Sequence, residues 1–233
     1  MNKKGAGHIE FILSFILFVG VVTFAIFFFN PAADSKVVGS TLPFVFSEFK
    51  KNVNVELDIF SIVINKDLVN GDVISVEIKE VEPEKNIRVE DYDGYVLDSV
   101  RAGDIVSFNF DKEDFVLVKF SEAFTSPVPP SKIPPEKESY YEIASSSSRE
   151  LISEEKVMEL KDLYESDYEA SKERFNLPPG LDFSFVLAFS DEDFISAQRD
   201  IPEGVEIFSK IRGEEVLREE GSLAFADLSV AIW

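Results

Sequence analysis

Residues 53–64, VNVELDIFSIVI, carry the pattern that decides the fold. Every second residue from Val53 to Ile59 is apolar and the residues between them are polar, so the apolar side chains lie on one face of a β-strand. The phase then slips by one residue at Phe60, as a β-bulge would cause. The stretch therefore predicts a strand with one buried face and one irregularity.

The same period of two recurs in the residues that follow. It places these apolar side chains on strand faces: Ile74, Val76, Ile78, Val106, Phe108, Phe110, Val116, Val118 and Phe120. Turn signals at Asn70-Gly71, Asp93-Gly94 and Gly103-Asp104 separate the runs. Short strands at this spacing predict an antiparallel β-sandwich over residues 37–125. The immunoglobulin-like fold is one form of such a sandwich, although its cysteine and tryptophan hallmarks are missing.

A second domain is predicted in the carboxyl-terminal part of the chain. Residues 126–147 hold five of the eleven prolines and are rich in serine, which indicates a stiff linker. Ser147 and Glu150 have the spacing of a capping box, so a helix is expected to begin there and to end before the NLPPG motif at 176–180. Apolar runs after this motif predict strands, and residues 148–233 are therefore expected to form an α+β domain, a helix followed by an antiparallel meander.

The amino-terminal segment is apolar over a long distance. Phe11–Phe29 comprises 19 uncharged residues, which as a helix would span ~28 Å, close to the thickness of the hydrocarbon layer. Asn30-Pro31 either stops this helix or restarts it at a new angle. We therefore predict a single transmembrane helix within residues 6–33, with the lipid bilayer as a partner. A secretory signal cleaved near Ala32 and Ala33 is the alternative.

Charge gives an expected orientation for this segment. Lys3 and Lys4 precede it, so the positive-inside rule predicts a cytoplasmic amino terminus and an extracytoplasmic domain over residues 34–233. The expected location is the cell membrane in a single pass, with the carboxyl-terminal part at the cell surface or in a pilus.

The first residues form a recognisable motif. Lys3-Lys4-Gly5, then Ala6, then Glu10 and an unbroken apolar run resemble the class III signal of type IV prepilins and archaeal pilin-like surface proteins. The resemblance implies that a prepilin peptidase cuts the leader 1–5 after Gly5 and that Ala6 becomes the new terminus. It also implies that the apolar helix packs with other pilin-like subunits, and that Glu10 pairs with the freed amino terminus of a neighbour. Gly7 offers an alternative cut. Pilins usually extend this helix as an amphipathic stalk, whereas Asn30-Pro31 interrupts it here.

Composition excludes several classes of function. The net charge is −21 overall, and because Lys3, Lys4 and Glu10 contribute +1, the rest of the chain carries −22, so nucleic acid is not an expected partner. The chain has no cysteine and one histidine, so we expect no metal site and no cofactor. Catalytic motifs are missing, and the carboxylate pairs Asp91/Asp93 and Asp191/Asp193 are expected from the number of acidic residues alone. We therefore expect no catalytic residues and no enzyme.

These observations lead to two expected functions. The first is a pilin-like cell-surface protein, processed by a prepilin peptidase and displayed as a membrane-anchored or minor pilus-type subunit with an acidic head. The alternative is a permanently anchored extracytoplasmic binding or adhesion module that forms no filament.

Overall fold

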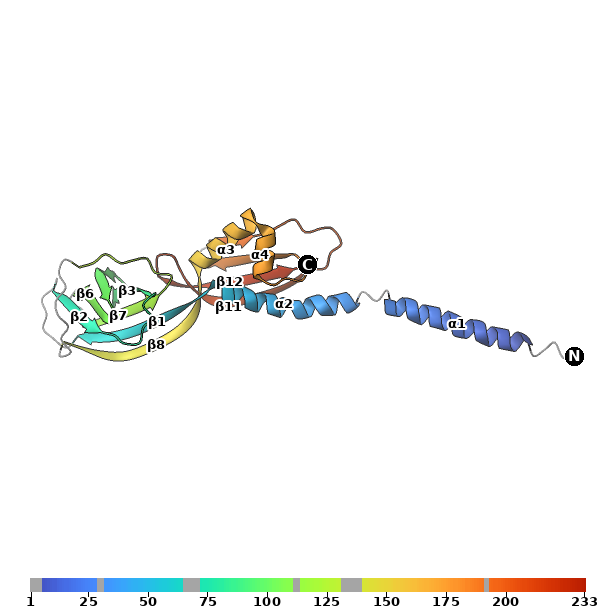
Figure 1. Cartoon of the computed structure of the whole chain (residues 1–233), viewed down its shortest axis with the longest axis horizontal. Helices are drawn as coiled ribbons and strands as arrows, with labels where there is room; N and C mark the ends of the chain where they lie inside the picture. Colours follow the sequence, from blue (N-terminus) through green and yellow to red (C-terminus); the bar gives the residue numbers. More distant parts are fainter. Residues whose placement is uncertain (1–5, 29–31, 65–71, 111–113, 131–139, 191–192) are drawn as a thin grey trace.

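The computed structural model describes residues 6–28, 32–64, 72–110, 114–130, 140–190 and 193–233, with side chains for residues 11–24 and for those from residue 41 onward. Two helices open it, α1 (Ala6–Phe28) and α2 (Ala32–Val53), and α2 runs directly into strand β1 (Asn54–Ile64). Figure 1 shows a β-rich body, from which α1 extends away beyond the end of α2. The elongated shape therefore separates a single helix from a folded head.

Two sheets make up the head. Within the described residues the larger sheet has nine strands in the order β10-β9-β12-β11-β8-β1-β7-β3-β4. Besides β1, these are β10 (Phe194–Ala197), β9 (Phe183–Phe189), β12 (Leu223–Ile232), β11 (Phe208–Leu217), β8 (Tyr141–Ser153), β7 (Phe115–Ser121), β3 (Asn86–Asp91) and β4 (Val96–Leu97). The smaller sheet has the order β2-β6-β5, with β2 (Val73–Glu77), β6 (Ile105–Asn109) and β5 (Ser99–Ala102).

The distal lobe, which comprises β1 to β7, is a sandwich of the smaller sheet against one end of the larger sheet. Its core contains the buried side chains that the alternating pattern predicted in β2, β6 and β7, with Phe108 and Phe120 fully buried. In β1 the buried positions change phase as expected, and the pairing register with β8 shifts between Ser61 and Ile62. The strand pattern is therefore confirmed in this lobe. The extra residue at the register shift is Ala144, so the bulge lies in β8 and not in β1, where it was expected.

The proximal lobe comprises α2, α3 (Glu154–Ser166), α4 (Tyr168–Arg174) and β9 to β12. The three helices pack on one face of the sheet and share one hydrophobic core with it. Phe49 of α2 lies at the centre of this core, 5.8 Å from the ring of Phe175 and 4.9 Å from that of Phe185. The apolar stripe of α2 is thus covered by the sheet, in contrast to α1.

Strands β1 and β8 join the two lobes. They pair antiparallel from Asn54↔Ile152 to Ile64↔Tyr141, so one continuous ladder runs from the proximal core into the distal lobe. A small apolar cluster that includes Leu57, Leu151 and Leu217 fills the junction. Gly221, in the turn between β11 and β12, lies against Arg88 of β3, where an added Cβ would come within 2.8 Å of the Arg88 side chain. The lobes are therefore connected by packed side chains as well as by backbone.

The structure corrects the expected membrane-anchored fold. In the part of the chain that it describes, no helix is both long enough and apolar enough to cross a lipid bilayer. The prediction of a single transmembrane helix is therefore wrong. The single-pass location at the cell membrane, and the orientation drawn from Lys3 and Lys4, depended on that helix and fall with it.

The structure also differs from the prediction in the type of two segments, one at each end of the predicted sandwich and linker. Residues 37–53, assigned to the sandwich from sequence, belong to α2, because its apolar residues face the proximal core. The last part of the segment expected to be a linker belongs to β8, because it pairs with β1. Ser147 and Glu150 lie within β8 and are no capping box; α3 begins later, where the Ser153 side chain accepts a hydrogen bond from the backbone N–H of Lys156.

Candidate functional site

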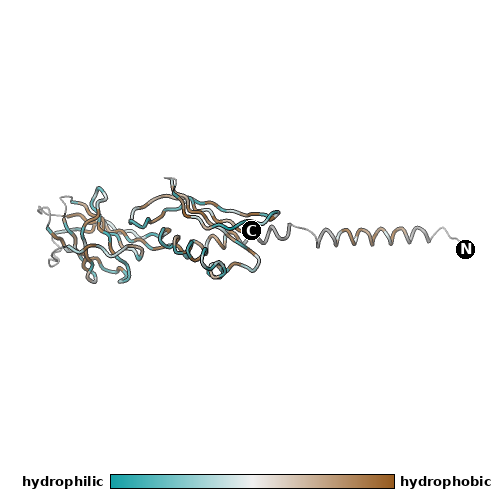
Figure 2. The backbone as a smooth tube through the Cα atoms, turned by 90° about the horizontal axis from the view of Figure 1, so that it is seen from above, coloured by the Kyte–Doolittle hydropathy of each residue, from teal (hydrophilic) through white to brown (hydrophobic). Residues whose placement is uncertain are grey.

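Helix α1 presents apolar side chains to solvent around its whole circumference. Among its described residues, the large apolar side chains from Phe11 to Phe24 are 38–73% exposed. Figure 2 shows brown, the colour of hydrophobic residues, predominating along this helix outside the head. No charged residue lies between Phe11 and Phe29, so no polar face distinguishes one side of α1 from another. A helix of this kind is stable in water only when another molecule covers it.

The predicted processing and assembly residues lie at the amino-terminal end of α1. Lys3, Lys4 and Gly5 are outside the described residues. Ala6 is the first residue of α1, and Glu10 belongs to the same helix, although its side chain is not described. Ala6 and Glu10 lie four residues apart, about one turn of α1.

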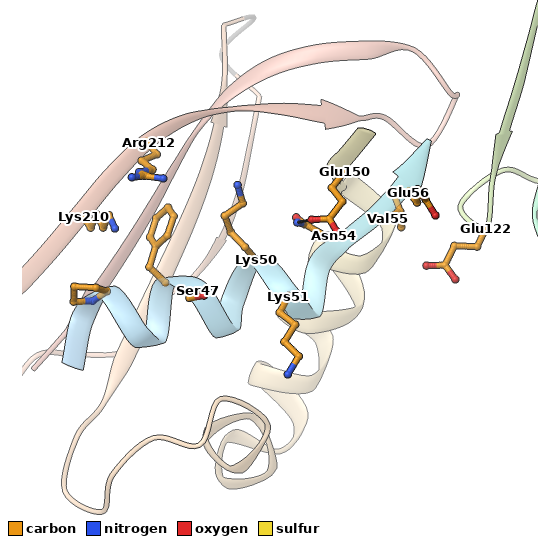
Figure 3. Close-up of a pocket in the computed structure, with 12 residues that line it drawn as sticks. Ser47, Lys50, Lys51, Asn54, Val55, Glu56, Glu122, Glu150, Lys210 and Arg212 are labelled. Carbon is orange, nitrogen blue, oxygen red and sulfur yellow. Dashed lines mark hydrogen bonds between the residues drawn. The ribbon is translucent and has the colours of Figure 1, made fainter. Parts of the chain in front are cut away.

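A groove of about 640 Å³ runs along the flank of α2 in the head. One end is basic and is formed by Lys50 of α2 with Lys210 and Arg212 of β11; the other end is acidic and carries Glu56, Glu122 and Glu150 (Figure 3). Alternation along β11 explains the basic end, because Lys210 and Arg212 are two residues apart and therefore face the same side as α2. The groove thus has opposite charges at its two ends.

The cations at the basic end are held against an aromatic ring. Lys210 Nζ lies 4.7 Å and Arg212 Cζ 5.9 Å from the centroid of Phe46, which is 2% exposed. Lys50 forms an ion pair with Glu214, with Nζ 2.8 Å from Oε2. Over the described residues no carboxylate forms an ion pair with Lys210 or Arg212. Two unpaired cations over one ring favour the approach of an anionic group.

The carboxylates at the acidic end are already engaged. Lys156 forms an ion pair with Glu122, and Asn54 donates a hydrogen bond to Glu150. A hydrogen bond from Lys85, supported by one from Ser148, lowers the pKa of Glu56, against the opposing effect of its slight burial. Burial works to lower the pKa of Lys85, but hydrogen bonds to Asp58 and Glu56 outweigh it and raise the pKa. Each carboxylate at the acidic end therefore already has a hydrogen-bond or ion-pair partner within the chain.

Two tyrosines in the proximal core form the other unusual polar cluster. Tyr164 donates a hydrogen bond to the carbonyl oxygen of Phe183, and Tyr168 donates one to Asp182 Oδ1. Burial raises the pKa of Tyr164 to about 12 and also raises that of Tyr168. Arg199 covers the Tyr168 ring at 4.1 Å from its centroid. Both hydroxyls are thus neutral donors at neutral pH, and their geometry fastens α3 and α4 to β9.

The described members of the two carboxylate pairs considered from sequence lie in turns or at strand ends. Asp91 ends β3, and its side chain accepts a hydrogen bond from the N–H of Tyr95, so Asp91 and Asp93 belong to the predicted hairpin turn. Asp193 lies near Arg218 at 3.6 Å, while Asp191 is outside the described residues. Within the described part of the chain, no group of three or more acidic, histidine or cysteine residues is placed to hold a metal ion. Comparisons of the chain with protein-family models, curated proteins and solved structures find no match.

The basic end of the groove was missed from sequence. Its signal was present, because Lys210 and Arg212 alternate with Ser209 and Ile211 in the pattern of a strand. The sequence did not reveal that α2 packs beside these two residues, because residues 37–53 were expected to form strands. Helix α2 brings Phe46 and Lys50 to β11 from about 160 residues away in the sequence. The groove exists only because α2 packs across β11.

Proposed function

We propose that the chain is a pilin-like subunit that assembles with other copies through α1 and displays its β-rich head from the assembly. The observation that carries this proposal is the exposure of every described large apolar side chain of α1. Burying a Phe, Leu or Ile side chain contributes about 1.5–3 kcal/mol, so packing several of them between copies would drive association strongly. The proposal includes no catalytic role for the head.

The position of α2 supports the same proposal. After α1, residues 32–53 form an amphipathic helix whose buried side rests on the sheet of the proximal lobe, and the pilin resemblance implies an amphipathic helix after the apolar one. The folded head therefore begins directly on the helix that follows α1. In the alternative function, a binding or adhesion module without a filament, α1 would have no protein partner to cover it.

The amino terminus of the native chain tests the proposal. Mass spectrometry of the intact protein from its native source should give a chain that begins at Ala6 and retains residues 11–24. Gly5→Val should abolish this cut, because it places a branched side chain where a very small one is required. Gly7→Val is the matched control and should leave the cut in place. A native chain that begins at Met1 or Asn2 would contradict pilin-like processing, and one that begins at His8 would assign the cut to Gly7.

A further inference from the structure

We infer that the basic end of the groove, formed by Phe46, Lys50, Lys210 and Arg212, binds the exposed face of α3 of a second copy of this chain. The inference rests on the proposed assembly and adds a contact between heads to the contact through α1.

Two of the three cations at the basic end of the groove have no ion pair among the described residues, and the third, Lys50, pairs with Glu214. Lys210 and Arg212 lie over the ring of Phe46, and neither forms an ion pair with any residue that the structure describes. Such an arrangement is unusual in a chain with 44 acidic and 23 basic residues, in which a carboxylate is a far commoner neighbour. An acidic surface is therefore the partner that the site favours.

The exposed face of α3 has the complementary chemistry. Glu155, Glu159 and Asp162 are exposed and lie three to four residues apart, so they form one acidic stripe along the helix. Met158, 42% exposed, lies within this stripe. The described residues offer these three carboxylates no ion pair, whereas the two lysines of α3 are paired, Lys156 with Glu122 and Lys161 with Glu165. The stripe thus presents an apolar centre with an acidic rim.

The two surfaces belong to neighbouring helices of the proximal lobe, because α2 contacts both β11 and α3, and α3 also contacts β10. Within one copy, the described residues form no ion pair between the acidic stripe and Lys210 or Arg212. A contact between unlike surfaces of two copies is heterologous, and repetition of such a contact produces a ring or a filament. This is the type of contact that an assembly joined through α1 allows between neighbouring heads.

Cysteine cross-linking tests the contact in the full-length chain, which has no cysteine of its own. Ser47, an exposed residue of the groove, is changed to Cys in one copy and Met158 to Cys in another, and the two are co-assembled. A disulfide-linked dimer is expected. Tyr92→Cys, at an exposed hairpin of the distal lobe, replaces Met158→Cys as the control and should give none. No dimer with Met158→Cys would overturn the inference.

Charge exchange separates specific docking from chance collision. Arg212→Glu in the Ser47→Cys copy should lower the dimer yield on the order of tenfold, because like charges then face each other. Adding Glu159→Lys to the Met158→Cys copy should restore the yield. Lys79→Glu makes the same charge change in the distal lobe, outside the groove, and it should leave the yield unchanged. Equal yields for Arg212→Glu and Lys79→Glu, or no restoration, would overturn the proposed contact. Figure 3 shows the position of Arg212 in the groove.

Sedimentation of the same samples separates this inference from the proposed function. Chains that sediment as multi-copy particles but give no Ser47–Met158 dimer would refute the contact between heads and leave assembly through α1 standing. Chains that sediment as single copies would refute both.

Discussion

Phe49 shows what a single residue contributes to the head. It is fully buried, and its ring packs between α2, Phe175 and Phe185, so it holds the helix to the sheet. Phe44 lies on the same helix but is 46% exposed. Replacing each of these two phenylalanines by alanine therefore separates the effect of burial on stability from the effect of helix propensity.

We expect Phe49→Ala to lower the free energy of unfolding by about 3–5 kcal/mol, because it leaves a cavity in the proximal core. Phe44→Ala should cost less than about 1 kcal/mol. Urea unfolding followed by circular dichroism measures both changes. Equal losses for the two variants would contradict the packing of α2 described above.

Tyr164 makes stability depend on alkaline pH. Its folded pKa, raised to about 12 by burial, lies above the ordinary value of 10.0, so the folded state keeps the proton that the unfolded state loses. Its contribution is therefore fully present below pH 10 and is lost as the pH rises toward 12. The free energy of unfolding should fall between pH 8 and pH 11.5, and in Tyr164→Phe this fall should be smaller by about 1–2 kcal/mol. Unfolding of the wild type and the variant at both pH values measures the difference. If the variant loses as much stability at alkaline pH as the wild type, groups other than Tyr164 cause the pH dependence.

At the scale of elements, helix α3 begins at a later residue than the sequence pattern predicts. The sequence offers Ser147 three residues before Glu150, a capping box by spacing, but β8 continues through both. The cap is Ser153, with Glu154 and Glu155 in the first helical turn. Pairing with β1 prevails over the local signal because it satisfies backbone groups along the whole of β8.

We therefore expect Ser153→Ala to destabilise the chain by about 1 kcal/mol and Ser147→Ala to have little effect. Thermal unfolding of the two variants, which differ only in the position of one hydroxyl, measures the difference. The reverse order of stabilities would place the start of the helix at Ser147 after all.

The sequence predicted the elements whose residues show a clear periodic pattern, and it missed those that depend on packing against distant residues. The strands of the distal lobe were predicted, because alternation in β1, β2, β6 and β7 follows from one buried face. Helix α2 was missed because Pro43 and several β-branched residues weaken its helical signal, and packing on the sheet supplies what propensity lacks. The groove was missed together with α2, because its basic end forms only where Lys210 and Arg212 lie over the ring of Phe46.

At the scale of the whole molecule, one prediction concerns Glu10. In an assembly, its carboxylate would pair with the ammonium group at Ala6 of a neighbouring copy, in surroundings of low dielectric constant. Glu10→Gln should leave the cut after Gly5 intact but lower the sedimenting fraction several-fold, because the buried ammonium group loses its counterion. Glu10→Asp keeps the charge and should retain more of the assembly. Unchanged sedimentation of Glu10→Gln would remove Glu10 from the assembly contact.

The account depends most on the claim that α1 is covered by α1 of other copies. A cysteine scan over residues 11–24 of the full-length, cysteine-free chain tests it directly, because an intermolecular disulfide at each position reports which side of α1 faces a neighbour. Registered packing predicts disulfide yields that rise and fall with the 3.6-residue period of a helix. A flat profile, as from random collision, or no cross-linking at any position would contradict assembly through this helix.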